Sequence, residues 1–228
     1  MKKYEYNKNV FKNINTEEEA YWLGFILADG CNIGNKNLRV NIKDKGHLEK
    51  LSKLIYIDEK PISITDHGFG PIYYFSCTKK EIINNLNNYG VVPRKSKIAK
   101  FPIIKEHLYR HFIRGLFDGD GSICYTMDKN YRRYQFSIVG TEQLMKKIYD
   151  IFLKETNIVL GYGKMKMIYR VYKKGNQQIM SILNWLYKDA SVYLDRKHDK
   201  YEDMLNYYIL KANTYSRNVL IEKVNILK

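Results

Sequence analysis

The strongest hydrophobic pattern in this chain occurs twice, in two apolar segments that carry small residues four positions apart and end in Asp-Gly. The small residues are Gly24 and Ala28 in the first segment, and Gly115 and Gly119 in the second. Because positions i and i+4 lie on one face of a helix, the pattern predicts two helices, each with a smooth stripe for close packing against another backbone. The two segments are Trp22-Leu23-Gly24-Phe25-Ile26-Leu27-Ala28-Asp29-Gly30 and Ile113-Arg114-Gly115-Leu116-Phe117-Asp118-Gly119-Asp120-Gly121.

An aspartate stands at the end of each predicted helix, and packing of the two stripes would bring Asp29 and Asp120 together. That placement is unfavourable for folding, because a helix C-terminus carries partial negative charge and neighbouring carboxylates repel each other. A divalent cation between them would remove both objections. The simpler alternative is an ordinary helix stop with Gly in the left-handed cap position. The repetition of the whole pattern favours the cation site.

Strict alternation of apolar and polar residues predicts strands with one buried face. It occurs at residues 38–43, 133–138 and 164–171, and shorter strands are expected at 62–65 and 72–77. Apolar residues at helical spacing separate these strands, so each half of the chain reads helix, strands, helix, strands, helix. The prediction is an α+β (mixed α/β) fold, duplicated with pseudo-two-fold symmetry and containing two antiparallel sheets.

This repeat divides the chain into three parts. Residues 1–15 are polar and basic without periodicity and are expected to form an N-terminal arm. Thr16 and Glu19 form a capping box that starts the first helix. The first repeat then covers residues 16–101, and the second repeat with its C-terminal helices covers residues 102–228.

The composition narrows the class of partner. The chain has 228 residues with 39 Lys and Arg against 24 Asp and Glu, a net charge of +15 that indicates a polyanion such as nucleic acid. A bias toward Lys, Ile, Asn and Tyr is also expected from an AT-rich genome, which weakens this argument. The three cysteines match neither a zinc pattern nor a disulfide framework. Without a signal peptide or an apolar run of membrane-spanning length, an intracellular protein with no membrane partner is expected.

The paired motifs resemble those of the LAGLIDADG homing endonucleases, a family named after this nine-residue pattern. The second copy is the closer match, because Asp118 and Asp120 keep both acidic positions, whereas Leu27 replaces the earlier Asp of the first copy. The resemblance extends over nearly the whole chain from about Thr16. Two motifs in one chain are similar to the monomeric, pseudo-symmetric branch of the family. The resemblance implies a sequence-specific DNA endonuclease that makes a staggered double-strand break in a long target site.

The resemblance also implies a metal site. The final Asp of each motif holds the catalytic metal in this family, so Asp29 and Asp120 are expected to hold Mg²⁺ for phosphodiester hydrolysis. The backbone carbonyls of Gly30 and Gly121 are expected as further metal ligands. Mn²⁺ is expected to substitute, and Ca²⁺ to bind without supporting cleavage.

Two lysines stand where the family places a basic residue, after the last helix of each repeat. Lys95 and Lys197 are expected to polarise the attacking water or neutralise the transition state. An ordinary surface lysine is the alternative in a chain so rich in lysine. Asp44 and Gly140 resemble a water-ordering position in the family. Because Gly140 has no side chain, the two halves are expected to cut their strands unequally.

The polar faces of the predicted strands are candidates for contact with DNA, because a two-stranded β-ribbon fits the major groove. If both sheets turn these faces the same way, they form a DNA-binding saddle for a double-stranded target. The candidate DNA-binding residues are Arg39, Asn41, Lys43, Arg133, Gln135, Ser137, Lys164, Lys166 and Arg170.

Other functions are compatible with parts of this pattern. An intron-RNA maturase or a non-cleaving nucleic-acid-binding protein of the same fold would share the helices and sheets. A general packaging protein would not need the paired small-residue helices. His107 and His111 lie four residues apart, a spacing that suits zinc, but no third ligand accompanies them, so they are expected to be surface residues.

Overall fold

The computed structural model describes residues 4–66, 68 and 70–215, and the chain divides into two compact units, Met1–Asp120 and Gly121–Lys228. The division follows the packing of the second motif helix, which contacts the first motif helix most extensively. It therefore differs from the division into repeats at residues 101 and 102. Each unit is described by itself.

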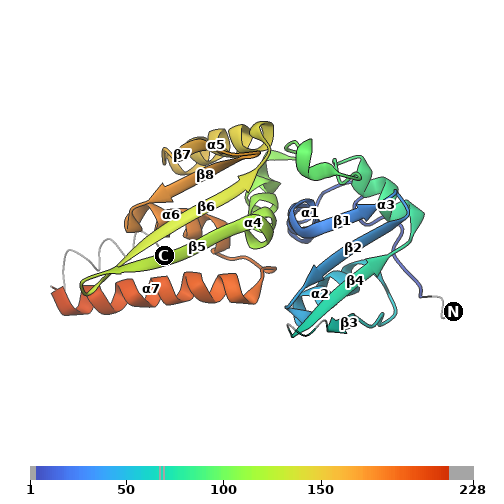
Figure 1. Cartoon of the computed structure of the whole chain (residues 1–228), viewed down its shortest axis with the longest axis horizontal. Helices are drawn as coiled ribbons and strands as arrows, with labels where there is room; N and C mark the ends of the chain where they lie inside the picture. Colours follow the sequence, from blue (N-terminus) through green and yellow to red (C-terminus); the bar gives the residue numbers. More distant parts are fainter. Residues whose placement is uncertain (1–3, 67, 69, 216–228) are drawn as a thin grey trace. The chain divides into compact units, whose positions relative to one another are not determined.

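The first unit contains one four-stranded antiparallel sheet in the order β1-β2-β4-β3, with α1 leading directly into β1 (Figure 1). Two short 3₁₀ helices, η1 and η2, follow α3. The elements are α1 (Glu17–Asp29), β1 (Gly30–Ile33), β2 (Asn37–Ile42), α2 (Lys45–Ile55), β3 (Ser63–Asp66), β4 (Pro71–Cys77), α3 (Lys80–Asn87), η1 (Lys95–Lys97), η2 (Glu106–Leu108) and α4 (Tyr109–Asp120).

The second unit contains a second four-stranded antiparallel sheet in the order β5-β6-β8-β7 (Figure 1). The strand order is the same as in the first sheet, and each sheet follows a motif helix. The predicted α+β fold and its duplicated helix-strands-helix-strands-helix order are confirmed. The elements are β5 (Gly121–Asp128), β6 (Tyr131–Gly140), α5 (Glu142–Thr156), β7 (Gly161–Met165), β8 (Ile168–Lys174), α6 (Asn176–Tyr187) and α7 (Asp195–Tyr215).

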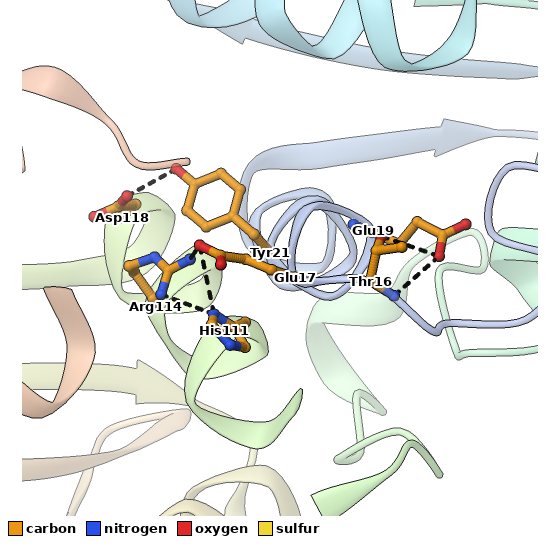
Figure 2. Close-up of polar contacts among 7 residues, drawn as sticks. All are labelled: Thr16, Glu17, Glu19, Tyr21, His111, Arg114 and Asp118. Carbon is orange, nitrogen blue, oxygen red and sulfur yellow. Dashed lines mark hydrogen bonds and ion pairs between the residues drawn. The ribbon is translucent and has the colours of Figure 1, made fainter. Parts of the chain in front are cut away.

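The predicted capping box starts α1. The Thr16 hydroxyl accepts a hydrogen bond from the Glu19 backbone N–H at 3.2 Å, and the Glu19 carboxylate accepts one from the Thr16 N–H at 3.3 Å (Figure 2). Both bonds satisfy N–H groups that a helix start leaves without an intrahelical partner.

Helices α1 and α4 pack along their small-residue stripes, as the sequence predicts. A Cβ atom on Gly24 would lie 2.0 Å from the Phe112 carbonyl oxygen, and one on Gly115 would lie 1.9 Å from the Tyr21 carbonyl oxygen. Side chains have no room at either position, so the two backbones touch directly.

A buried polar network also joins these helices. The Arg114 guanidinium is fully buried and donates to the Glu17 carboxylate at 2.7 Å, and its other terminal nitrogen lies 3.1 Å from His111 Nδ1 (Figure 2). Burial and the Arg114 charge lower the pKa of His111 to about 4. The expectation that His111 is a surface residue is therefore wrong, because its ring lies between two helices.

The N-terminal segment contributes to the core of the first unit. Val10, Phe11 and Ile14 are buried, and Tyr6 forms an antiparallel bridge with Tyr56. Three apolar residues at irregular spacing carry no periodic signal, which is why the sequence indicated only a polar arm.

At the other end of the chain, α7 is one long helix whose bounds include the predicted apolar positions Tyr201, Met204, Leu205 and Tyr208. The further predicted position, Leu220, lies outside the described residues. None of the described helices has the length and apolar character needed to span a membrane.

The predicted single strand at residues 164–171 is wrong. Two strands, β7 and β8, occupy this region, and Lys166 and Met167 form the two-residue connection between them. Lys166 has a positive φ of 49°, a conformation that tight hairpins require and that usually selects Gly or Asn. Without such a residue the alternation continues across the turn, so the turn leaves no trace in the pattern.

Candidate functional site

The two motif aspartates are the last residues of α1 and α4. A Cβ atom on Gly119 would lie 2.5 Å from the Ala28 Cβ and 3.5 Å from Asp29 Oδ2. The Asp29 carboxylate therefore lies beside the residue that precedes Asp120. The small-residue stripes continue to the helix ends and bring the two acidic positions to one place in the first unit.

The glycine after each aspartate begins a strand, Gly30 in β1 and Gly121 in β5. Gly30 has an extended backbone (φ −75°, ψ 146°), and its N–H donates to the Ile26 carbonyl. A Cβ atom there would lie 2.5 Å from that same oxygen. The close approach of the Ile26 carbonyl oxygen therefore explains why this position is Gly. The left-handed cap of an ordinary helix stop does not explain it.

Lys95 reaches the end of α1 from η1 and, as a residue, is 5% exposed. Its ammonium donates to the carbonyl oxygens of Leu27 at 2.6 Å and Ala28 at 3.0 Å. These carbonyls belong to the last turn of the helix, where the peptide dipoles leave partial negative charge. A buried cation is thus fixed at the acidic end of α1.

Both aspartates affect the pKa of Lys95. Burial lowers the pKa of Lys95, whereas the negative charges of Asp120 and then of Asp29 raise it. The opposing effects locate the ammonium within electrostatic reach of both carboxylates. The site therefore combines two carboxylates at the ends of packed helices with one buried lysine ammonium from η1.

The second predicted lysine occupies a similar environment in the second unit. Lys197 lies in the first turn of α7, is 5% exposed, and its ammonium donates to the Gly121 carbonyl oxygen. That carbonyl is one of the predicted metal ligands, and here it accepts a hydrogen bond from lysine. Asp44 stands at the N-cap position of α2 and Gly140 ends β6.

The acidic pair suits Mg²⁺ by its chemistry. Mg²⁺ prefers oxygen ligands and is commonly held by one or two carboxylates, with waters and substrate phosphate oxygens completing its coordination. The described residues contain no cluster of three or more His, Cys, Asp or Glu side chains that could hold a metal. Asp29 and Asp120 would therefore supply two carboxylates, and the remaining ligands would come from outside the side chains of this chain.

Asp118, the other acid of the second motif, has a different position. It is fully buried and accepts a hydrogen bond from the Tyr21 hydroxyl at 2.7 Å (Figure 2). The Tyr21 hydroxyl also lies 3.1 Å from His47 Nε2. The bond between Tyr21 and Asp118 joins α4 to α1, so Asp118 stabilises the helix pair. At the corresponding position Leu27 is buried as an apolar residue. The sequence did not reveal this role, because the motif carries both acids in one run.

The first sheet presents a polar face on β2. Leu38, Val40 and Ile42 are buried, and the intervening Arg39 and Asn41 lie on the opposite face. Asn41 is exposed and Arg39 is half-buried. Lys43 follows directly after the end of β2. Alternation in the sequence predicted this arrangement of β2.

The second sheet presents Arg133, Gln135 and Ser137 on one face of β6, opposite buried Tyr134, Phe136 and Ile138. This polar face continues onto β8, where Arg170 stands in register with Val139. These candidate contact residues from two strands therefore share one face.

Lys164 and Lys166 do not share that face, so their predicted alignment with Arg170 is wrong. Lys164 is in register with Tyr169, which alternates with Arg170 along β8, and its ammonium lies 5.9 Å from the centre of the Tyr169 ring. Lys166 lies in the hairpin turn. Because a strand exposes alternate residues on opposite faces, the unrecognised turn reversed the assignment.

Taken together, these features define a class: duplicated α+β proteins in which two helices pack through glycines, end in adjacent aspartates and each lead into a four-stranded antiparallel sheet. Comparison of the sequence with protein-family models and with curated proteins found no match. Comparison of the fold with solved structures found similar proteins, and they identify the architecture. This chain has the LAGLIDADG fold.

Three of these structures illustrate the likeness. The LAGLIDADG meganuclease I-AabMI, bound to uncleaved DNA, is 12% identical, with 91% of this chain and 96% of that chain covered and a TM-score of 0.59. The meganuclease I-SmaMI, bound to uncleaveable DNA, is 13% identical, with coverages of 95% and 97% and a TM-score of 0.59. Full-length DUF199/WhiA from Thermatoga maritima is 19% identical, with coverages of 88% and 64% and a TM-score of 0.53.

Proposed function

We propose that this protein is a homing endonuclease, a sequence-specific DNA endonuclease that makes a staggered double-strand break in a long target site by Mg²⁺-dependent phosphodiester hydrolysis. The observation that carries the proposal is the position of Asp29 beside Gly119, the residue that precedes Asp120, at the ends of two helices whose backbones touch. An acidic pair at helix C-termini opposes folding. Its presence at a place fixed by three glycines favours a functional reason.

In this proposal Asp29 and Asp120 hold the metal, and the carbonyls of Gly30 and Gly121 contribute where they are accessible. When bound, Mg²⁺ supplies an activated water and stabilises negative charge on the phosphate. Mn²⁺ would substitute, and Ca²⁺ would bind without supporting cleavage. The glycine contacts hold the ends of the two helices together, and metal-assisted hydrolysis requires ligands at fixed positions.

Lys95 would neutralise charge in the transition state. Burial lowers the pKa of Lys95, and the nearby charges of Asp120 and Asp29 oppose this shift. Its ammonium also donates to two carbonyl oxygens, which favours the protonated form. An ammonium has three donors, so one remains for a phosphate oxygen. Lys197 would serve the second cleavage in the same way, through its position beside Gly121.

The proposed partner is double-stranded DNA, bound by a monomer with internal pseudo-symmetry. The net charge of +15 and the polar faces of the two sheets support it. Similar solved structures include meganucleases bound to DNA. On this proposal, the polar faces of the sheets contact the duplex through Arg39, Asn41, Lys43, Gln135, Ser137 and Arg170. Arg133 is left out of this set because it is ion-paired with Asp128.

The test is cleavage of a plasmid library of randomised inserts by the full chain in Mg²⁺. Double-strand breaks at one preferred sequence are expected. Asp29→Asn and Asp120→Asn should each reduce the rate at least 100-fold and leave binding to that sequence in Ca²⁺ within a few-fold. Asp150→Asn, which changes an exposed acid on α5, is the matched control and should cleave normally.

Two outcomes would contradict the proposal. Undiminished cleavage by both motif variants would mean that neither aspartate is needed for the reaction. Specific binding without any breakage, by wild-type protein in Mg²⁺ and in Mn²⁺, would favour a non-cleaving nucleic-acid-binding protein of the same fold.

A further inference from the structure

Two arginines on the polar sheet faces are held over tyrosine rings. The Arg39 guanidinium lies 4.2 Å from the centre of the Tyr74 ring, and the Arg170 guanidinium lies 4.5 Å from the centre of the Tyr172 ring. Each unit contributes one such pair. Stacking on an aromatic face restrains a side chain that is otherwise among the most mobile.

Both arginines occupy the middle of their sheets. Arg39 is on β2 and Tyr74 on β4, the two central strands of the first sheet, and Arg39 is in register with Cys31 and Ser76. Tyr74 is the diagonal neighbour of Arg39 across the strand pair, within reach of a long side chain.

In the second sheet, Arg170 and Tyr172 are both on β8, one of the two central strands. The neighbours of Arg170 in register are Val139 and Gly163, of which one is apolar and the other has no side chain. Both stacks therefore lie on central strands of their sheets, away from the edge strands.

The hydrogen-bonding groups of these two guanidinium groups are unused. Among the described residues, Arg39 and Arg170 have no hydrogen-bond or ion-pair partner, and Arg39 Nε is shielded from solvent without an acceptor. A guanidinium has five donors in a planar fork, and stacking through its face leaves the edges free. Each of these guanidinium groups is therefore restrained by its stack and still lacks an acceptor for its hydrogen bonds.

Other arginines of the chain differ in this respect. Arg133 lies on the same face as Arg170 but is ion-paired with Asp128. Arg132 lies over the Tyr125 and Tyr207 rings and is ion-paired with Asp203 at 2.7 Å. Arg114 is buried against Glu17. Each of these three guanidinium groups is already ion-paired with a carboxylate.

We infer that Arg39 and Arg170 each recognise a guanine in the major groove of the target, and that Arg133 does not. This inference rests on the proposed function. A guanine presents N7 and O6 as two acceptors that match the fork of an arginine, and this pairing is the commonest specific contact in the major groove. A central position on the sheet favours a base edge, because phosphates lie along the rims of the groove.

The experiment selects binding sequences from a randomised duplex library in Ca²⁺ with wild-type protein and with Arg39→Ala, Arg170→Ala and Arg133→Ala. Wild-type protein should select a consensus with at least two strongly preferred guanines. Arg39→Ala and Arg170→Ala should each abolish one of these preferences, a different one in each variant, with a 10- to 100-fold loss of discrimination at that base pair. The matched control, Arg133→Ala, should keep the full consensus.

Two further measurements address the stacks and the base atom. Tyr74→Leu should lower the discrimination that Arg39 provides several-fold, and Tyr74→Phe should keep it. Replacing the guanine assigned to Arg39 by 7-deazaguanine removes N7 and should weaken wild-type binding 10-fold or more, with no further effect on Arg39→Ala. Thermal melting of each variant verifies that it is folded.

The outcomes separate the inference from the proposed function. A library that yields no consensus contradicts the proposed function. A consensus whose guanine preferences persist in Arg39→Ala and Arg170→Ala contradicts the inference alone. Equal weakening of all sequences, with a salt dependence reduced by about one phosphate contact, would assign these arginines to the DNA backbone and overturn guanine recognition.

Discussion

Arg114 and His111 lie three residues apart on α4 and share the carboxylate of Glu17. The buried guanidinium has the shorter contact, 2.7 Å against 3.6 Å for the imidazole. A second positive charge on His111 would stand beside Arg114 in a poorly solvated site. Burial and Arg114 consequently lower the pKa of His111 from 6.5 to about 4.

This shift predicts a dependence of stability on pH. Between pH 6.5 and 4 the unfolded chain protonates His111 and the folded chain does not, so protons favour unfolding. The contribution of His111 to the stability is fully present above about pH 6.5 and is lost as the pH falls toward about 4. Chemical denaturation at several pH values measures it. His111→Gln should reduce the slope in this range, whereas His107→Gln, at an exposed position one turn earlier, is the matched control. An unchanged slope in His111→Gln would contradict the assignment.

At the scale of elements, the glycine contact between α1 and α4 determines where the aspartates lie. Gly115→Ala places a Cβ atom 1.9 Å from the Tyr21 carbonyl, so the helices must separate. We expect a loss of about 3 kcal/mol of unfolding free energy, since overpacking against rigid backbone is costly. Gly46→Ala in α2, where a Cβ atom meets nothing within 4 Å, is the control and should gain about 0.5–1 kcal/mol from helix propensity. Equal stabilities of the two variants would refute direct backbone contact.

The periodicity of the sequence predicted most of the elements, because burial on one face determines both the apolar spacing and the element. The helix pair, β2, β6 and the order of each repeat follow from it. It failed at Lys166, where a hairpin turn lacks Gly or Asn, and at Phe11, whose burial depends on contacts distant in the chain. The position of Asp29 beside Gly119 could be predicted because the stripe fixes it. The roles of Asp118 and of the two arginine–tyrosine stacks could not, because they depend on partners from other elements.

At the scale of the whole molecule, the charge of +15 predicts a steep salt dependence of DNA binding. If six to ten phosphates are contacted, affinity should fall about 10³- to 10⁵-fold between 50 and 200 mM salt. Fluorescence anisotropy with the selected duplex in Ca²⁺ measures this. Lys43→Ala, next to the polar face of β2, should lower the slope by about one. Lys146→Ala, on α5 and ion-paired with Glu142, should leave it unchanged. A flat dependence would contradict extensive phosphate contact.

The central claim is that Asp29 and Asp120 form one metal site, and a double-mutant cycle on metal affinity tests it most directly. Mn²⁺ binding to the complex of protein and selected duplex is measured by electron paramagnetic resonance for wild-type protein, Asp29→Asn, Asp120→Asn and the double variant. Two carboxylates that share a site give strongly non-additive effects. We expect at least a 10-fold loss of Mn²⁺ affinity in each single variant and little further loss in the double variant. Unchanged affinity in the single variants, or independent and additive losses, would contradict it.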